Sequence, residues 1–219
     1  MTTSSVIKYH LAELEIAKTP DSPRHIMPTF SSEEQAILDI GCGIGQTFVA
    51  SEGIHDRLLV GIDIDLEALV YGHKNFDYIL FAQATAERLP FPDSLFDLVI
   101  SRVVLPLTNM PVSLREIARV LKRNGRIWFT LHPFSMVTSH LFHSLQNLNA
   151  KDAAYRIYAI LNGLVFNSFG NMFPFPMTNK YESFQTNSGM TRAMKKIGFE
   201  GVTLERKGKH LVCTARKKP

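Results

Sequence analysis

Two aspartates that each close an apolar run are the residues of this sequence best placed to do chemistry. Asp39 ends the first run and is followed by glycines at alternate positions, Gly41, Gly43 and Gly45, whereas Asp63 ends the second run. Glycine lets a strand turn sharply into a helix and lets backbone N–H groups approach a ligand without a Cβ in the way. Nucleotide-binding α/β sheets hold a ribose diol with an acid at the tip of the second strand, about 20 residues beyond such a turn.

Seven short apolar runs supply the sheet that would position these acids. Helical patterns separate most of them, and this alternation predicts an α/β fold with a doubly wound, mostly parallel, Rossmann-like sheet. The last two runs are separated only by a basic turn at 206–209, so they are expected to form an antiparallel hairpin. The expected strands cover residues 36–40, 58–63, 79–83, 96–101, 126–131, 201–205 and 210–215.

Three helices between these strands have recognisable ends. Asp65 is expected to cap the first helix, which runs to about residue 74. Its residues expected to face the sheet are Leu66, Leu69 and Val70. The expected start and stop residues of the other two helices are Pro111 with Gly125, and Ser188 with Gly198.

The chain is expected to form a single domain over residues 1–219, with two segments outside the alternation of strands and helices. Residues 1–35 are expected to form an N-terminal helix and a proline-broken link. Residues 134–187 are expected to form a helical insert, which holds ten of the chain's 21 Phe and Tyr in 54 of its 219 residues. Three interpretations of this insert stay open: an apolar face docked on the sheet, a lid over a pocket, or a subunit interface. Tyr155 and Tyr158 are candidates to face such a pocket together.

The formal charge of +4 is mild, but much of it lies near the C-terminus, where residues 201–219 hold six cations against Glu205 alone. These cations are interpreted either as a solvated turn and frayed tail or as a contact for RNA or another polyanion. The N-terminus has no signal-peptide pattern, and no run approaches the ~18 apolar residues of a membrane span. Cys42 and Cys213 are expected to be free thiols, which favours a cytoplasmic location.

Four stretches together carry a family resemblance. Their order and spacing resemble those of the class I S-adenosylmethionine-dependent methyltransferases, in particular the small methyltransferase-domain type. One glycine turn alone would be a weak signal, whereas four stretches in register are specific. The stretches are ILDIGCGIG at 37–45, LLVGIDID at 58–65, ATAERLPFPDSLFDLVIS at 84–101 and LREIARVLKRNGRIWF at 114–129.

The resemblance implies S-adenosylmethionine as the cofactor and gives a role to each residue of the glycine turn. Gly41, Gly43 and Gly45 would lie along the methionine and ribose portions of the cofactor. Asp39 would help to orient the turn and the ligand's ammonium group. Asp63 would accept hydrogen bonds from both ribose hydroxyls.

Six further cofactor contacts are implied by the same resemblance. Ile64 would pack on a face of the adenine, and the turn after the third strand would meet the adenine edge. The family commonly has an acid where this chain has Thr85, and a hydroxyl is a weaker acceptor than a carboxylate. The end of the fourth strand would border the transferable methyl. The residues implied are Cys42, as a small residue that fills the turn, with Ile64, Thr85, Ala86, Ser101 and Arg102.

The glycine spacing argues against a pyrophosphate ligand. A dinucleotide fingerprint has its third glycine where this chain has Gln46. An acid beside the turn, Asp39, suits a cationic ligand and repels a pyrophosphate. We therefore rank binding of a nicotinamide dinucleotide below methyl transfer.

His132 is the candidate general base. It follows the fifth strand at the carboxyl edge of the sheet, where ligands bind, and Pro133 fixes its backbone. The alternative is a hydrogen-bonded structural histidine. A base is needed only if the acceptor carries a proton with a high pKa. His140 and His143 are three residues apart, but no third ligand follows them, so no metal is expected.

The expected acceptor is a small molecule, an inference that rests on elimination. The sequence lacks the [DNS]-P-P-[YFW] tetrapeptide of methylases that act on exocyclic amines, and it lacks a Pro-Cys nucleophile. The aromatic insert favours an aromatic or lipid-like acceptor. Two alternatives stay open, namely a non-catalytic, cofactor-binding relative that acts as a partner subunit, and an RNA methylase. Either a monomer or a homodimer agrees with the sequence.

Overall fold

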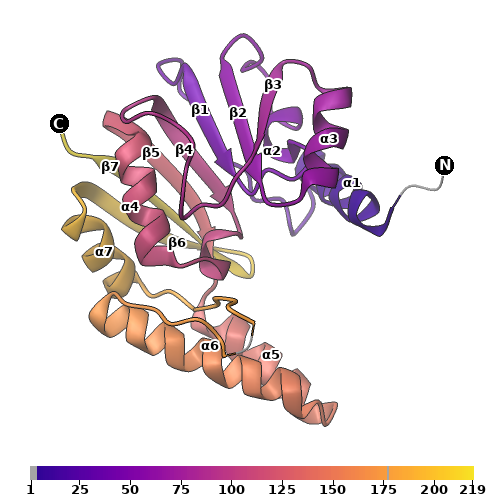
Figure 1. The fold of residues 1–219 in the computed structure, drawn as a ribbon, viewed down its shortest axis with the longest axis vertical. Coiled ribbons are helices and arrows are strands. Elements are labelled where there is room, and N and C mark those ends of the chain that lie inside the picture. The colour runs from indigo at the N-terminus through magenta and orange to yellow at the C-terminus, as the bar shows by residue number, and fades with distance from the viewer. Residues whose placement is uncertain (1–3, 177) are drawn as a thin grey trace.

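A seven-stranded mixed sheet with the spatial order β3-β2-β1-β4-β5-β7-β6 forms the centre of the molecule (Figure 1). The computed structural model describes residues 4–176 and 178–219. Strands β1 to β5 run parallel and β7 is antiparallel to both of its neighbours, so the predicted fold class and C-terminal hairpin are confirmed. The strands are β1 (Ala36–Ile40), β2 (Leu58–Asp63), β3 (Ile79–Gln83), β4 (Phe96–Arg102), β5 (Leu121–Leu131), β6 (Phe199–Lys207) and β7 (His210–Lys217).

The order of the strands reverses at β1. This strand pairs with β2 on one side and with β4 on the other, so the chain crosses over between β3 and β4. Open α/β sheets bind ligands outside the carboxyl ends of the strands at such a switch point. Asp39 near the end of β1, Asp63 at the end of β2 and Arg102 at the end of β4 all lie along this edge.

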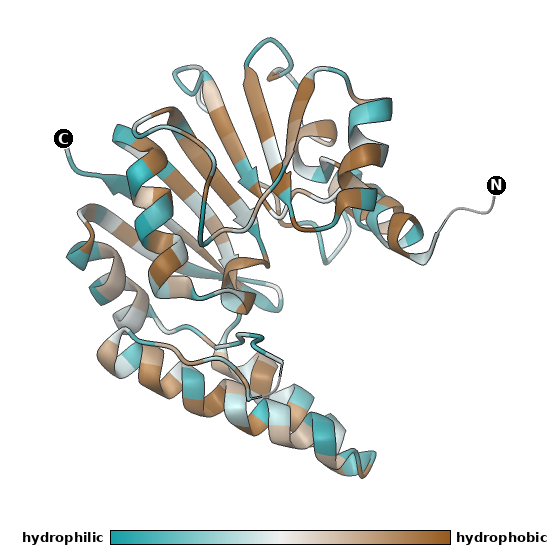
Figure 2. Cartoon of the chain, in the orientation of Figure 1, coloured by the Kyte–Doolittle hydropathy of each residue, from teal (hydrophilic) through white to brown (hydrophobic). Residues whose placement is uncertain are grey.

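Helices cover both faces of the sheet. Leu38 and Val99 pack on one face with α4 and α7, and Ile37 and Trp128 pack on the other face with α2. Strands buried on both faces have nearly continuous apolar sequences, which explains the brown central strands in Figure 2. The helices are α1 (Ser5–Lys18), α2 (Gln46–Val49), α3 (Leu66–Asn75), α4 (Met110–Val120), α5 (Phe134–Gln146), α6 (Ala150–Phe169) and α7 (Asn187–Lys196), with a 3-10 turn at Leu105–Leu107.

Helix α3 begins where the sequence predicts, but the predicted face is buried only at Leu69, which is 4% exposed. The Asp65 side chain caps it by accepting hydrogen bonds from the backbone N–H groups of residues 67 and 68. Leu66 and Val70, expected to face the sheet, are 56% and 59% exposed. The helix instead approaches the sheet through Gly72, where an added Cβ would lie 2.7 Å from the Phe81 ring. Because Gly72 has no side chain, the helix packs closely on this face, and Leu66 and Val70 lie on the face that points to solvent.

Of the four ends predicted for the other two helices, two are wrong and two are confirmed, one of them Pro111, which lies in the first turn of α4. Helix α4 passes directly into β5, and the left-handed position is taken by Asn124, with φ 61°, instead of Gly125. The cap of α7 is Thr186, whose Oγ1 accepts from the backbone N–H of Gly189 at 3.1 Å, instead of Ser188. Gly198 has φ 91° just beyond α7, as its role as a terminator requires.

The segment between β5 and α7 contains the α5–α6 pair and a return segment of irregular backbone. The pair projects beyond the carboxyl edge of the sheet (Figure 1). It has a small apolar core of its own, which includes Val137, Tyr158 and Phe184. Among the described residues, no helix combines the length and the apolar character needed to cross a bilayer.

Candidate cofactor and acceptor site

The turn after β1 has a backbone that only glycine adopts readily. Gly41, Gly43 and Gly45 have φ values of 77°, 55° and 91°, all in the left-handed region. The space is tight as well, because a Cβ on Gly41 would overlap the Val104 side chain, and a Cβ on Gly43 would overlap the His10 ring. The alternate glycines therefore serve both the sharp turn and the close approach of neighbouring groups.

Gly43→Ala is expected to destabilise the protein by more than its backbone strain. A left-handed non-glycine residue costs about 1–2 kcal/mol, and the added methyl group would also displace His10. Gly53→Ala is the matched control, because Gly53 also has a positive φ, at 70°, but an added Cβ would have no atom within 4 Å. Urea denaturation of the two variants should show a larger loss for Gly43→Ala; equal losses would contradict the close approach of His10.

Helix α1 covers this glycine turn, which the sequence did not predict. Nδ1 of His10 lies 2.8 Å from Nε2 of Gln46, and Ile7 and Leu14 pack against Ile44 within one apolar cluster. The Ser4 side chain caps the helix by accepting from the backbone N–H of Ile7. The apolar spacing of Ile7 and Leu14 was a signal for a helix, but nothing local in the sequence indicates where that helix docks.

Asp63 joins the tip of β2 to the glycine turn. Its Oδ2 accepts from the backbone N–H of Gly43 at 2.8 Å, and its Oδ1 accepts from the backbone N–H of Asp65 at 3.0 Å. Each carboxylate oxygen can accept a further hydrogen bond, and the side chain is only partly buried. Asp63 is thus held in a fixed orientation while it keeps the capacity to accept from a diol.

Asp39 is a buried carboxylate with no hydrogen-bond partner among residues 4–176 and 178–219 for either oxygen. Its exposed fraction is 1%. Burial raises its pKa to about 6; the Thr47 hydroxyl, close by but outside hydrogen-bond geometry, and the Arg102 guanidinium both lower it, and Asp63 raises it. A buried, unpaired carboxylate beside a glycine turn is chemically suited to a cationic group. The Asp39 carboxylate therefore fits a cofactor that carries an ammonium and a sulfonium.

An open groove of about 720 Å³ lies beyond β3, on the side where an adenine is expected. Thr85 lines this groove, whereas Ala86, also implied as a cofactor contact, is buried in the core and does not line it. Ile64 is 70% exposed. It lies next to the groove, because Nε2 of Gln83, a lining residue, donates to the Ile64 carbonyl at 2.9 Å. The residues that line the groove are Gln83, Ala84, Thr85, Arg88, Leu89, Pro90 and Phe91.

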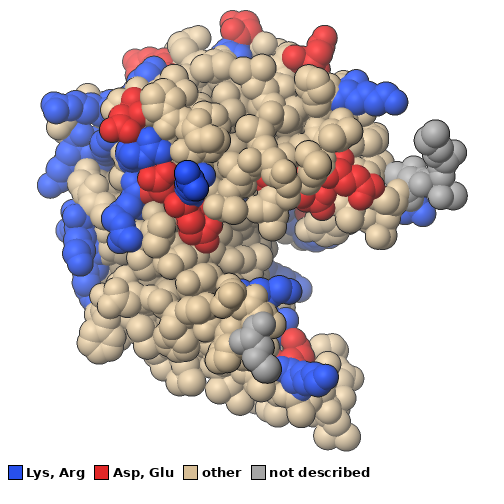
Figure 3. Space-filling view, viewed as in Figure 1, with Lys and Arg blue, Asp and Glu red and all other residues tan. Residues whose placement is uncertain are grey.

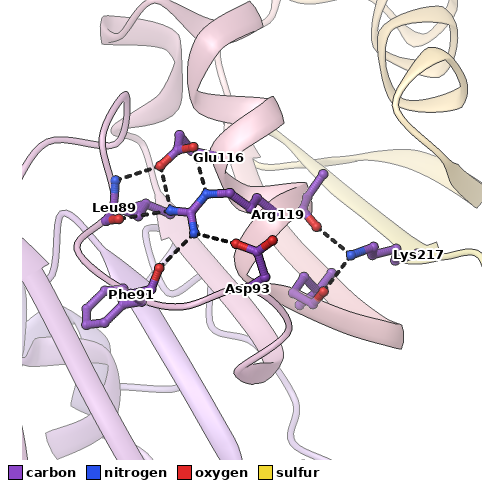
Figure 4. Close-up of polar contacts among 8 residues, drawn as sticks. Leu89, Phe91, Asp93, Glu116, Arg119 and Lys217 are labelled. Atoms are coloured by element: carbon purple, nitrogen blue, oxygen red, sulfur yellow. Dashed lines mark hydrogen bonds and ion pairs between the residues drawn. The ribbon is translucent and has the colours of Figure 1, made fainter.

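Arg119 of α4 holds the loop that carries this groove (Figure 4). Its guanidinium donates to the carbonyls of Leu89 and Phe91 at 2.9 and 2.7 Å, and to the carboxylates of Glu116 and Asp93. Glu116 in turn accepts from the backbone N–H of Leu89 at 2.9 Å. The hydrogen bonds with Arg119 lower the pKa of Glu116, so this pair stays charged at neutral pH.

Arg119→Met is expected to loosen the 88–93 loop and to lower the free energy of unfolding by about 2 kcal/mol, the value of hydrogen bonds to a charged group. The side chain of Arg119 is 31% exposed, so water screens its ion pairs and the loss should not exceed this value. Arg115→Met is the control, since Arg115 is exposed on the same helix. Chemical denaturation checks the loss, and an effect of Arg115→Met as large as that of Arg119→Met would rule out the loop contacts as its cause.

The end of β4 carries an unusual backbone. Val103 has φ 64°, which is strained for a β-branched residue, and its N–H donates to Oγ1 of Thr130 at 2.7 Å. Ser101 is fully buried and its hydroxyl donates to the Ile40 carbonyl at 3.1 Å, so it ties β4 to β1. Arg102 lies between them, half-buried. Strained residues of this kind cluster at functional sites.

Cys42 fills the space beneath the glycine turn. It is buried, and an added Cβ on Gly61 would lie 2.6 Å from its Sγ. Burial raises the pKa of its thiol well above the usual value, so the thiol stays protonated. A filling role agrees with these contacts.

His132 lies directly after β5. Two hydrogen bonds with Gln185 hold its backbone, and the Nδ1 atom of its ring is the group of interest. Its N–H donates to Oε1 of Gln185 at 3.1 Å, and the N–H of Gln185 donates to its carbonyl at 2.8 Å. Within the described part of the chain, its Nδ1 has no partner. Burial, with smaller contributions from the charges of His210, His140 and Arg156, lowers the pKa of His132 to about 4. The ring is therefore neutral at physiological pH and able to accept a proton.

The molecule is hollowed between the sheet and the α5–α6 pair (Figure 3). Phe134 is half exposed and packs edge-on against Phe184, with ring centroids 4.9 Å apart. Tyr158, in contrast, is buried, and its hydroxyl donates to the carbonyls of Phe173 and Lys180, so the expectation that Tyr155 and Tyr158 face a pocket as a pair is wrong for Tyr158. In the described residues no group of three or more His, Cys, Asp or Glu is arranged to hold a metal ion.

Comparison with known proteins identifies the class to which this fold and glycine turn belong. Residues 38–129 match the family model of a methyltransferase domain. The uncharacterized methyltransferase YcgJ of Bacillus subtilis is 33% identical over 105 residues, which cover 45% of this chain and 41% of YcgJ. The ubiquinone/menaquinone biosynthesis C-methyltransferase UbiE of Vibrio parahaemolyticus is 34% identical over 145 residues, covering 57% of this chain and 56% of UbiE. The chain thus spans about half the length of these curated relatives.

The fold is shared with solved structures over a longer stretch. Human N-acetylserotonin methyltransferase in complex with S-adenosylmethionine has a TM-score of 0.63 at 17% identity, covering 98% of this chain and 56% of the human chain. Residues 38–129 belong to the class I S-adenosylmethionine-dependent methyltransferases, whose cofactor is S-adenosylmethionine. The predicted family is therefore confirmed.

Proposed function

We propose that this protein transfers a methyl group from S-adenosylmethionine to a small-molecule acceptor. The observation that carries the proposal is Asp39, a buried carboxylate without a hydrogen-bond partner in the described residues, next to a glycine turn that has no phosphate-binding pattern. Leaving a buried carboxylate unpaired is costly. A cationic ligand at this edge of the sheet removes that cost.

Each residue of the site has a role in this proposal. The bound cofactor supplies a methyl group on a sulfonium, which is an excellent leaving group. Asp39 attracts the ammonium of its amino-acid portion, and Asp63 accepts from the ribose hydroxyls. Ile64 and Thr85 contact the adenine, with the 88–93 loop held in place by Arg119.

The protein's main contribution to the rate is orientation. Holding two reactants in line and excluding water is worth on the order of 7–11 kcal/mol in well-oriented systems. We assign the exclusion of water to residues 134–187, acting as a lid over the hollow seen in Figure 3, and to α1 on the other side. His132 accepts a proton where the acceptor carries one.

A small acceptor is supported by the relatives. UbiE is a C-methyltransferase of ubiquinone and menaquinone biosynthesis, and malonyl-[acyl-carrier protein] O-methyltransferase of Marinomonas is 30% identical over 104 residues. We extend from these proteins to this chain only the idea of a small, partly apolar acceptor group.

The test is binding followed by turnover. Isothermal titration should show that the protein binds S-adenosylmethionine and S-adenosylhomocysteine, and incubation of the labelled cofactor with fractionated cell extract should label a small molecule. Binding without any turnover would favour the non-catalytic alternative. Absence of binding would refute the proposal.

An RNA methylase is the second alternative, because cations gather at the left edge of Figure 3, over α7 and the C-terminal end of β7 as Figure 1 places them. Arg216 and Lys217 of this group donate to backbone carbonyls, so the predicted frayed tail is wrong at these two positions. The group lies at the amino edge of the parallel strands, opposite the glycine turn. Neutralising Lys195, Lys196 and Lys218 leaves those anchoring contacts intact, and only an RNA methylase should lose salt-sensitive RNA binding in that variant.

A further inference from the structure

The half of the site formed by β4, β5 and β7 is lined by basic side chains. Arg102 at the end of β4 lies opposite Thr130 of β5. The register of β5 with β7 pairs Leu131 with Leu211, so the next residues, His132 and His210, lie side by side with ring centroids 6.2 Å apart. Most residues assigned to the cofactor lie at or just after β1, β2 and β3. Ser101 and Arg102, at the end of β4, are expected to border the transferable methyl, so this basic half is the side on which the acceptor meets that methyl.

Three arginines are near enough to the histidine pair for their charges to act on one of its rings, and two of the three are neutralised. Arg24 pairs with Glu13, and Arg156 pairs with Glu182, at 3.0 Å, and with Asp152. Arg102 makes no hydrogen bond or ion pair with any residue in the described ranges 4–176 and 178–219. A half-buried guanidinium without a partner is unusual, because its five donors match carboxylate geometry well.

The charges that act on Arg102 change when the cofactor binds. Burial lowers the pKa of Arg102, and the negative charges of Asp39 and Glu13 oppose that shift through space. Glu13 already has Arg24 as its partner. In the proposed function Asp39 takes the cofactor's ammonium, and Arg102 then keeps no uncommitted negative neighbour. The site becomes more receptive to an anion once the cofactor is in place.

The backbone next to Arg102 is fixed by the strained Val103, whose N–H is held by Thr130. Such strain persists only where the surrounding structure imposes it. Without it β4 would continue in an extended conformation, and Arg102 would lose its present orientation at the switch point. The fold therefore keeps a guanidinium in a defined place, which surface arginines lack.

We propose that the acceptor carries an ionised oxygen, in a carboxylate, phenolate or enolate, which Arg102 binds beside the His132–His210 pair; this inference rests on the proposed function. The acceptor oxygen, or the carbon conjugated with it, forms a bond to the methyl carbon while the methyl–sulfur bond breaks. The electron pair of that bond stays on sulfur, which becomes a neutral thioether. A carboxylic acid that arrives protonated gives its proton to His132, whereas a phenolate or an enolate binds to Arg102 already ionised. The negative charge of the acceptor group and the positive charge of the sulfonium are thus both lost, and a methylated acceptor group and a thioether are formed.

The weak basicity of His132 agrees with this acceptor class. Burial and the positive neighbours hold its pKa near 4. An imidazole of that pKa removes protons efficiently only from acids of comparable strength. Alcohols and unactivated amines are therefore poor acceptors at this site.

The experiment uses matched pairs of probes with the full-length protein. Benzoate is compared with benzamide, 4-nitrophenolate with 4-nitroanisole, and a β-keto acid with its neutral amide, and methyl transfer from labelled S-adenosylmethionine is measured. We expect turnover with the ionisable members only. Arg102→Gln should lower kcat/KM for them roughly 10- to 100-fold, the effect of losing hydrogen bonds to a charged group, and Arg102→Lys should restore part of it. Arg115→Gln, on an exposed face of α4, is the control.

Binding measurements separate the acceptor's anion from the cofactor's own carboxylate. Affinity for S-adenosylhomocysteine should change less than twofold in Arg102→Gln. If that affinity falls while the affinity for methylthioadenosine, which lacks the amino-acid portion, does not, Arg102 binds the cofactor and the inference is overturned. Equal turnover of neutral and ionisable probes, or no turnover of any probe by a protein that binds S-adenosylhomocysteine, also overturns it. Failure to bind S-adenosylhomocysteine would overturn the proposed function together with this inference.

Discussion

Asp63→Ala is expected to weaken binding of S-adenosylhomocysteine by at least roughly 100-fold, because two charge-assisted hydrogen bonds to the ribose are lost at about 1.5–3 kcal/mol each. The side chain is oriented for this role by the backbone N–H groups of Gly43 and Asp65. Isothermal titration of the folded variant measures the loss. Asp56→Ala is the control, because Asp56 is an exposed aspartate just before the same strand.

The same contacts mean that Asp63→Ala also removes two anchors of the glycine turn, so a ligand-side measurement is needed. The wild-type protein should bind the 2′-deoxy form of S-adenosylhomocysteine more weakly than the parent compound. Asp63→Ala should bind the two compounds nearly equally, because the missing hydroxyl no longer has a partner. A variant that still prefers the intact ribose by the wild-type factor would show that Asp63 does not bind the diol.

Asp39→Asn is expected to separate stability from binding. The pKa of Asp39 is raised from 3.8 to about 6 in the folded protein, which corresponds to about 3 kcal/mol of destabilisation above pH 6. Between pH 4 and 6 the folded state holds a proton that the unfolded state has released, so the free protein loses stability from this group as pH rises through that range. The asparagine variant lacks this penalty, and at pH 7 we expect it to be more stable by up to about 3 kcal/mol while its affinity for S-adenosylmethionine falls.

Chemical denaturation of both proteins at pH 5 and pH 7, without ligand, checks this prediction. The difference between the two proteins should grow as pH rises, and groups such as Glu116, whose pKa is lowered, cancel in that comparison. Titrations of S-adenosylmethionine into the wild-type protein below pH 6 should also show proton release, since Asp39 must ionise to hold a cation. A pH-independent difference in stability would mean that Asp39 is not the unpaired acid of the site.

The parts of the candidate site that could be predicted are those marked by a local sequence pattern. The glycines, Asp39 and Asp63 each follow directly from the end of a strand, and the strand itself is identified by its apolar run. The cap at Asp65 is equally local. Short-range sequence suffices in these cases because the chemistry and the turn are within a few residues of each other.

The parts that were not predicted depend on tertiary placement. His10 reaches the glycine turn because α1 docks on α2 and α3, and His210 reaches His132 through the register of β5 with β7. The buried face of α3 was predicted correctly at Leu69 and wrongly at Leu66 and Val70, because Gly72, a residue without a side chain, decides how closely the helix packs. The periodicity of apolar residues predicts neither which distant elements pack together nor how closely a helix packs at a glycine.

The central claim is that the glycine turn, Asp39 and Asp63 together bind S-adenosylmethionine. A crystal structure of the protein with S-adenosylhomocysteine tests it most directly. We expect both ribose hydroxyls within hydrogen-bond distance of Asp63, the ammonium at Asp39 and the adenine beside Ile64 and Thr85. A ligand bound elsewhere, or a complex in which the Asp39 carboxylate stays unpaired, would contradict the account.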